Sequence, residues 1–217
     1  MMIFTRLINY LTTKTKERKI ENKNYRLKIF LLKIFLMLTI LETCINSEIN
    51  LVIQGDGKQQ FLDDYFFKIE PSEVLVNGVK DDSCSKTCNL AGDKNNITLK
   101  FDTQIESCYD MFEYLNNIIE IDLSKFDASK VIDMQCMFDG CANLEKIEFG
   151  NINTSSLVNM YAMFQSCKNL KSVDLSKFNA SKVTNMGFMF DGCSNLEKIE
   201  FGNINTSSLE YIINDRI

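Results

Sequence analysis

The sequence of 217 residues contains no histidine and no tryptophan, one proline and nine glycines. Histidine is the commonest general base and the commonest metal ligand, so its absence argues against an enzyme. So little proline and glycine excludes collagen-like and linker-rich chains. The formal net charge of −5 argues against nucleic acid as a partner, because binding to phosphates needs a basic face.

Positive charge is concentrated at the amino end, where residues 1–28 contain eight basic and two acidic residues. The apolar stretch IFLLKIFLMLTIL follows at 29–41, interrupted only by Lys33. This order is typical of a secretory signal, and the apolar run is shorter than the roughly 20 residues of a spanning helix. We therefore predict that residues 1–47 form a basic region plus a hydrophobic helix, acting as a signal peptide cleaved after Ser47 or as a signal anchor. A buried helix of an intracellular protein is the alternative.

The second half of the chain repeats itself with a period of 26 residues. Met-Phe pairs recur at 111–112, 137–138, 163–164 and 189–190. Other apolar positions keep the same interval: Val131, Leu157, Val183 and Leu209. A fixed period without insertions indicates repeats that stack, since one repeat cannot bury its apolar side chains alone.

A second period of 52 residues is superimposed on the first. Residues 137–157 and 189–209 differ only in having Ala142 in one and Ser194 in the other. We infer that two repeats were duplicated together.

One repeat, residues 144–169, illustrates the expected coil. Ile147 and Phe149 alternate with charged residues, which is the pattern of a strand with one buried face. The segment GNINTSS at 150–156 has the composition of a turn. The apolar residues within 157–164 are spaced to suit a short helical or irregular turn that points inward.

Residues 48–96 contain no repeat, and three segments at 48–55, 61–70 and 72–80 favour strands. We interpret this part as a β-rich cap that shields the first coil. A small independent binding module is the alternative interpretation.

The fold class predicted for the whole chain is an α/β repeat. It comprises a leucine-rich-repeat-type solenoid of about four 26-residue coils at 97–209, the cap at 48–96 and the hydrophobic helix before it. After Leu209 the sequence leaves the repeat phase, so residues 210–217 are expected to form an off-phase tail. We expect the last coil to expose apolar surface, or the product to be a truncated member of a longer array.

The repeat motif MFxxCxxLxxIxLxxFxxSxVxxM resembles that of the BspA-like leucine-rich-repeat surface proteins. It is met by MFDGCANLEKIEFGNINTSSLVNM and by MFQSCKNLKSVDLSKFNASKVTNM, and the resemblance covers about residues 97–209. It implies a secreted or cell-surface protein of bacteria or single-celled eukaryotes, associated with adhesion and partner binding. It implies no catalysis and brings no functional residues with it.

Three cysteines, Cys141, Cys167 and Cys193, share one repeat phase, in which the first coil has Leu115. A position that accepts leucine or cysteine is a small buried apolar position. Cys108 lies in the phase of the core methionines. We predict that all four are core thiols, with disulfides between coils as the alternative.

Cys84 and Cys88 lie outside the repeats, in the polar segment CSKTC. In an exported protein the first expectation is a local disulfide. Free or otherwise paired thiols and a metal site are the alternatives.

Candidate N-glycosylation sites have the sequence Asn-X-Ser/Thr and occur at Asn96, Asn153, Asn179 and Asn205. The last three share one turn phase of the repeat. They are acceptors in a eukaryotic secretory pathway, or else they recur because the turn favours asparagine.

The function expected from these features is a non-catalytic protein-interaction or adhesion module, secreted or at the cell surface. Its partner is expected to be a protein or glycan on host or neighbouring cells, with no nucleic acid, cofactor or metal. Membrane contact is expected only through residues 29–41, if they are not cleaved. The alternatives are an intracellular repeat scaffold and a non-functional fragment of a longer repeat protein.

Overall fold

The computed structural model describes residues 30–33 and 47–204. The chain divides into two compact units, residues 1–44 and 45–217. In the first unit, Phe30–Lys33 form a helical turn with exposed side chains. The remainder of the predicted basic region and hydrophobic segment lies outside the described residues, as does the tail at 210–217. In the described parts, no helix has both the length and the apolar character needed to cross a membrane.

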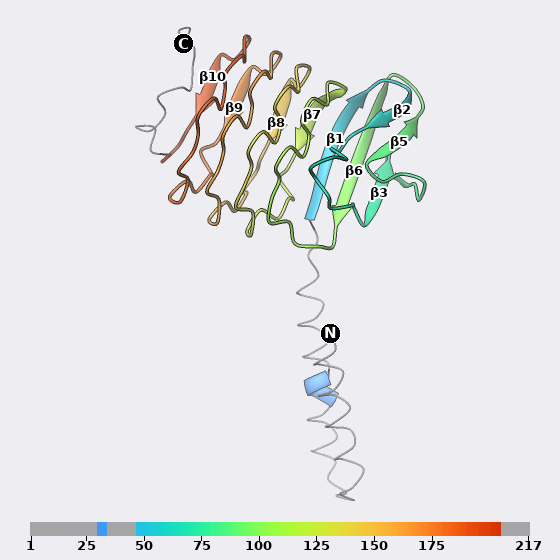
Figure 1. The fold of residues 1–217 in the computed structure, drawn as a ribbon. Helices are drawn as coiled ribbons and strands as arrows, with labels where there is room; N and C mark the ends of the chain where they lie inside the picture. The colour runs from blue at the N-terminus through green and yellow to red at the C-terminus, as the bar shows by residue number, and fades with distance from the viewer. Residues whose placement is uncertain (1–29, 34–46, 205–217) are drawn as a thin grey trace, which may run out of the picture. The chain divides into compact units, whose positions relative to one another are not determined.

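A six-stranded sheet forms the first part of the second unit, in the order β4-β3-β6-β1-β7-β8 (Figure 1). Its strands are β1 (Ser47–Gln54), β3 (Glu73–Val76), β4 (Val79–Lys80), β6 (Lys94–Phe101), β7 (Ile118–Asp122) and β8 (Lys146–Glu148). A separate antiparallel ribbon pairs β2 (Gly57–Gln60) with β5 (Thr87–Leu90). Strand β1 alternates buried and partly exposed residues along its length, as its apolar–polar alternation dictates.

The cap and the repeats share this sheet, because β1 pairs antiparallel with both β6 and β7. Strand β7 in turn pairs parallel with β8 of the next repeat. The expected boundary between residues 96 and 97 therefore falls inside β6. Within this one sheet, the pairing changes at β7 from antiparallel on the side of the cap to parallel on the side of the repeats.

The strand expected at 61–70 is absent, and a loop takes its place. The carboxylate of Asp63 accepts hydrogen bonds from the backbone N–H groups of Tyr65, Phe66 and Phe67, at 3.0, 2.5 and 2.9 Å. A side chain that binds its own backbone in this way favours a turn over an extended strand. Phe61 and Phe67 still enter the core, which explains the apolar character of the segment.

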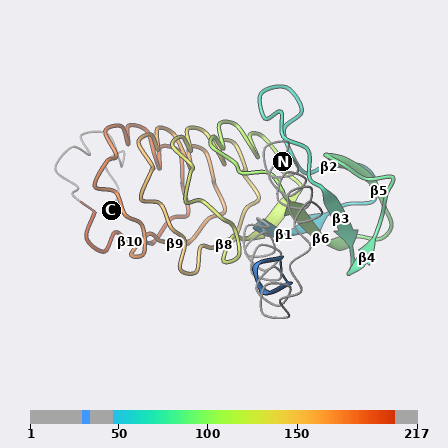
Figure 2. The same cartoon turned by 90° about the horizontal axis from the view of Figure 1, so that it is seen from below.

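Successive repeats lie parallel to one another, one 26-residue step apart (Figures 1 and 2). Their strands are β7, β8, β9 (Ser172–Asp174) and β10 (Lys198–Glu200). A second line of parallel bridges joins Ser107, Asp133, Asn159 and Asn185. Each side chain therefore lies beside its own counterpart in the next repeat.

The repeat core is built around the Met-Phe pairs, all eight residues of which are buried. The rings of Phe112, Phe138, Phe164 and Phe190 stack in one column, with centroids 5.6, 5.3 and 5.3 Å apart. Parallel stacked rings at such distances are favourable. The phenylalanine column therefore runs from the first repeat to the last.

The predicted α/β leucine-rich-repeat-type solenoid is wrong. Within residues 47–204 every regular element is a β-strand, and irregular turns occupy the Met-Phe segments. Two positions in each repeat have positive φ, and they break any helix. The first is occupied by Asp110, Cys136, Ala162 and Phe188, and the second by Tyr114, Gly140, Ser166 and Gly192. The expected hydrophobic helix is described only as the four-residue turn Phe30–Lys33.

The strands of the repeats pair in twos, although the Met-Phe turns are joined by backbone hydrogen bonds from each repeat to the next. Strand β8 belongs to the six-stranded sheet, whereas β9 and β10 form a sheet of their own. Within each pair a glycine with φ near +56°, Gly150 or Gly202, packs against a serine of the preceding repeat. These serines are Ser124 and Ser176. The 52-residue period of the sequence thus corresponds to a structural pair of repeats.

Candidate binding surface

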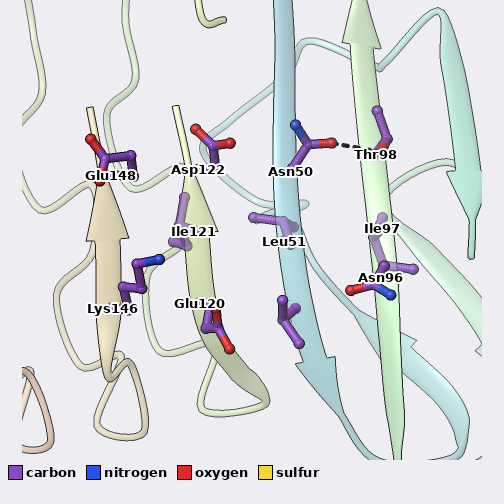
Figure 3. A pocket seen from close by; sticks show the side chains of 11 residues that line it. Asn50, Leu51, Asn96, Ile97, Thr98, Glu120, Ile121, Asp122, Lys146 and Glu148 are labelled. Atoms are coloured by element: carbon purple, nitrogen blue, oxygen red, sulfur yellow. Dashed lines mark hydrogen bonds between the residues drawn. The ribbon is translucent and has the colours of Figure 1, made fainter. Parts of the chain in front are cut away.

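One face of the six-stranded sheet is polar, and it forms a shallow groove of about 300 Å³ across β6, β1, β7 and β8. The apolar residues Leu51, Ile97 and Ile121 turn their side chains into the core, so their strand neighbours point to the other face. Figure 3 shows these outward residues in two rows across the strands. We call this surface the sheet groove.

The first row of the sheet groove contains Thr98, Asn50, Asp122 and Glu148, which the strand register places side by side. The hydroxyl of Thr98 donates to the side-chain oxygen of Asn50 at 2.7 Å (Figure 3). The second row contains Asn96, Val52, Glu120 and Lys146. Both rows are fixed by backbone pairing, so the groove is preformed.

Charges in and near the sheet groove are held by local hydrogen bonds. The carboxylate of Asp122 accepts from the N–H of Ser124 at 2.8 Å, and Glu120 faces the ammonium of Lys94 at 3.4 Å. At the equivalent position two repeats on, Asp174 has a lowered pKa, because Ser176 donates hydrogen bonds to it. Mixed, oriented charges of this kind suit the binding of a polar partner.

The structure joins Cys84 and Cys88 by a disulfide bond. The bond ties the start of β5 to the loop before it, and Cys88 packs into the core of the cap. Asp81 lies beside this bond, with a carboxylate oxygen 3.9 Å from the sulfur of Cys88. Asp81 is itself held by Ser83.

Cys141, Cys167 and Cys193 each direct the thiol at a backbone carbonyl oxygen of the preceding repeat. The acceptors are Phe112, Phe138 and Phe164, at 2.9, 3.1 and 2.9 Å. Burial raises the pKa of Cys141 and of Cys193 to about 12, so both stay protonated. Protonated thiols are poor nucleophiles and poor metal ligands, so a structural role fits them.

Cys108, the fourth predicted core thiol, is fully buried. It lies in the phase of the core methionines and is not aligned with the other three. Burial raises its pKa well above the usual range of a thiol.

Asn96, Asn153 and Asn179 are exposed, and Asn205 lies outside the described residues. The side-chain oxygens of Asn153 and Asn179 each accept the N–H two residues on, at 3.1 Å. Asp127 does the same in the first repeat, at 3.0 Å. The turn therefore favours Asn or Asp at this position. This preference explains why the asparagines recur, whether or not they are glycosylated.

A model of one protein family matches residues 106–214, half of the chain. The family is described as "Mycoplasma protein of unknown function, DUF285". The chain belongs to this family. The DUF285 match contains β7 to β10 and all four Met-Phe turns, while the cap strands before residue 106 lie outside it. No curated protein and no solved structure matches the chain.

Sequence reasoning missed a cluster of carboxylates where the DUF285 region meets the cap. Asp110, Glu113, Asp133 and Asp139 come together on the Met-Phe turns of the first two repeats, and we call this cluster the acidic corner. Backbone hydrogen bonds assemble it: the N–H of Asp110 binds the oxygen of Gln135 at 3.2 Å, and that of Tyr114 binds the oxygen of Asp139 at 2.7 Å. The signal was present in the sequence, because the equivalent segments 107–115, 133–141, 159–167 and 185–193 contain five acidic and no basic residues.

Proposed function

We propose that this protein is a non-catalytic binding module that acts outside the cytoplasm and takes its partner through the sheet groove. The observation that carries the proposal is the groove itself. It has two rows of side chains, all polar except Val52, which the backbone pairing of β6, β1, β7 and β8 holds in register. A rigid, preformed surface loses little conformational entropy when a partner binds.

Two further features support a location outside the cytoplasm. The basic and apolar order of residues 1–47 is typical of export. The disulfide between Cys84 and Cys88 is the kind of bond that persists in an oxidising compartment. The resemblance of the repeat motif to BspA-like surface proteins agrees with both.

The chemistry of the groove favours an extended polar partner, a polypeptide or a glycan chain. Asn50, Asn96 and Thr98 supply amide and hydroxyl groups, and Asp122 and Glu148 supply carboxylates. This mixture donates and accepts hydrogen bonds along a strip that is open to solvent. Such strips bind chains better than compact small molecules, because few of their contacts are enclosed.

Protease treatment of intact cells tests the location. Cells that express the chain with an epitope tag after Ile217 should lose the tag signal when a protease is added outside. A cytoplasmic protein in the same cells must stay intact, as a control for lysis. Full protection of the tag on intact cells, with digestion after lysis, would contradict the proposal.

Adhesion of coated beads tests the groove. Beads carrying the purified chain should adhere to cultured epithelial cells, and the double variant Asp122→Asn with Glu148→Gln should lose most of that adhesion. Both replacements keep the local hydrogen bonds to Ser124 and Gly150 possible. The matched control is Glu145→Gln with Glu197→Gln, which removes the same charge from exposed positions outside the groove. Equal adhesion of all three proteins would assign binding elsewhere.

A further inference from the structure

The acidic corner combines excess negative charge with a buried acceptor that has no partner. Asp110 is only 2% exposed, and among the described residues its Oδ1 is the buried side-chain oxygen or nitrogen without a hydrogen bond. A buried polar atom in this condition costs free energy comparable to a lost hydrogen bond, and one on a charged group costs more. This unfavourable free energy arises at Asp110, in the Met-Phe turn of the first repeat.

The groups that face Asp110 are themselves acidic. The pKa of Asp110 is raised to about 6, and burial is the main cause. A hydrogen bond with Tyr109 lowers this pKa, and the carboxylates of Asp63, Asp139 and Asp133 contribute to its rise. Burial likewise raises the pKa of Glu113 to about 7, with the same direction of effect from Asp110 and Asp139. The pKa of Asp139 is raised by burial too.

Two lysines of the cap lie near the acidic corner, and both direct their ammonium groups at other atoms. Lys68, which lines a pocket with Phe66 and Tyr109, directs its ammonium at the main-chain oxygen of Asp64, at 3.3 Å, and at the ring of Tyr65. Lys86, the buried lysine of the cap loop, directs its ammonium at the main-chain oxygens of Asp63 and Phe67 and faces Glu70 at 4.0 Å. The Met-Phe turn segments 107–115, 133–141, 159–167 and 185–193 contain no lysine or arginine. A site with this charge asymmetry attracts a cation from outside the molecule.

Aromatic rings border the acidic corner. Tyr114 is 64% exposed and Phe66 50% exposed, and Phe66 contacts Tyr109 edge to face with centroids 5.6 Å apart. Tyr109 adjoins the carboxylate of Asp110. Ring faces attract ammonium and guanidinium groups, and exposed rings beside carboxylates give such a group two favourable contacts at once.

We propose that the acidic corner and its bordering rings Tyr109 and Tyr114 bind a lysine- or arginine-bearing polypeptide segment of a partner protein. This surface is separate from the sheet groove, so it goes beyond the function proposed above. The partner's cation lies against Glu113 and the rings, and the field of Asp110 and Asp139 acts on it with little screening, because both are shielded from water.

A calcium or magnesium ion is the competing occupant. Of the described residues, only Asp81, Cys84 and Cys88 bring three ligand atoms within 4.8 Å of one another, so the acidic corner is not arranged to ligate an ion. A long flexible cation needs no such convergence, because a carboxylate and a ring on either side of it suffice. The geometry therefore favours a side chain.

Fluorescence anisotropy with a labelled synthetic peptide of alternating arginine and glycine tests this proposal. The full chain should bind this peptide at neutral pH and low salt, and should not bind one with glutamate in place of arginine. Asp110→Asn with Glu113→Gln should weaken binding at least tenfold. Asparagine suits position 110, where φ is +54°, because it tolerates that conformation better than other residues.

Two controls separate the acidic corner from general electrostatics and from the sheet groove. Glu145→Gln with Glu197→Gln removes the same charge elsewhere and should change the affinity no more than twofold. Tyr114→Asn keeps the charge and accepts positive φ, and should weaken binding several-fold. Affinity should also fall as pH drops from 7.5 to 5.5, because the corner carboxyls then take up protons, and this fall should disappear in the Asp110→Asn, Glu113→Gln variant.

Three results would overturn the proposal: no binding of the arginine peptide by the wild type, equal loss in the corner and control variants, or selective displacement of the peptide by calcium chloride over sodium chloride at equal ionic strength. The last would assign the corner to a metal ion. The adhesion assay tests the sheet groove alone. If the groove variant adheres as well as the wild type, the peptide-binding result still stands, so each proposal can be contradicted independently of the other.

Discussion

The cap and the repeats use the same sheet in opposite ways. In the cap, β1 and β6 are eight residues long and pair antiparallel over their whole length. In the repeats, β8 to β10 are three residues long, and order comes from turns bonded to turns and from the phenylalanine column. The cap is stabilised by one long antiparallel strand pair. The repeats are stabilised by short strand pairs, turn-to-turn hydrogen bonds and stacked rings that recur from one repeat to the next.

The largest expected effect lies in the phenylalanine column. Phe138→Ala should lower the free energy of unfolding of the full chain by about 3–5 kcal/mol, because it removes a buried ring with stacked neighbours on both sides. Chemical denaturation followed by circular dichroism measures this change. Val158→Ala, at an exposed position of the same repeats, should cost about 0.5 kcal/mol or less. Similar losses in the two variants would mean that the column does not stabilise the repeats.

A glycine substitution tests the close contact between paired repeats. At Gly150, φ is +56° and an added Cβ would lie 2.7 Å from the Cβ of Ser124. Gly150→Ala should therefore cost about 1–2 kcal/mol for the backbone and about 1–3 kcal/mol more for the overlap. Gly92 in the cap has φ of +86° but open space around it. Gly92→Ala should show the backbone cost alone, and an equal shift in melting temperature for both variants would argue against tight pairing.

Acid should act on the two regions in opposite directions. Asp110 and Glu113 have raised pKa values of about 6 and about 7, so their ionisation destabilises the folded state. The free energy of unfolding should therefore rise by on the order of 2 kcal/mol as pH falls from 8 to 5.5. In the cap, a hydrogen bond from Lys125 lowers the pKa of Glu48, so that contribution is lost only in more acidic solution, as pH falls through the lowered pKa.

Denaturation curves at several pH values test this contrast. Asp110→Asn with Glu113→Gln should flatten the rise between pH 8 and 5.5 and stabilise the protein at pH 8. A wild type that loses stability steadily over the same interval would contradict the raised pKa values.

The smallest effect concerns the recurring asparagine. Asn153→Asp should leave stability nearly unchanged, because Asp127 makes the same hydrogen bond in the first repeat. Asn153→Ala removes that acceptor and should cost about 1 kcal/mol. If aspartate proves as costly as alanine in thermal unfolding, the turn does not explain why asparagine recurs there.

The sequence allowed much of the repeat region to be predicted, because each position is repeated and its average character is visible. The inward Met-Phe pairs, the strands at Ile121 and Ile147 and the burial of Cys141 follow from that averaging. The choice between a helical and an irregular turn could not be made from the sequence, because the first positive-φ position holds Asp, Cys, Ala or Phe in turn. Backbone hydrogen bonds between repeats fix that conformation, and no residue type there signals it.

The cap could be predicted only in part, because its segments do not repeat. The strands expected at 48–55 and 72–80 correspond to β1 and to β3 with β4. The segment 61–70 is as apolar as a strand, yet one carboxylate, that of Asp63, turns it into a loop. The shared sheet could not be seen either, since β1 and β7 are far apart in sequence. The acidic corner lies at this same junction. The excess of acidic residues is visible in the sequence, but the position of Asp63 beside Asp110 is not, because it depends on how the cap folds against the first repeat.

Strand pairing is interrupted between β8 and β9, and this interruption bears on how the number of repeats can change. Gain or loss of two repeats keeps every Gly150-type turn against a serine of the Ser124 type. Gain or loss of one repeat would place two glycine-bearing turns or two serine-bearing turns next to each other. The contact between a glycine and a serine, as in Gly150 with Ser124, would then be lost. We therefore expect changes in repeat number to destabilise the fold less in even steps than in odd ones, because only even steps keep each positive-φ glycine against its serine.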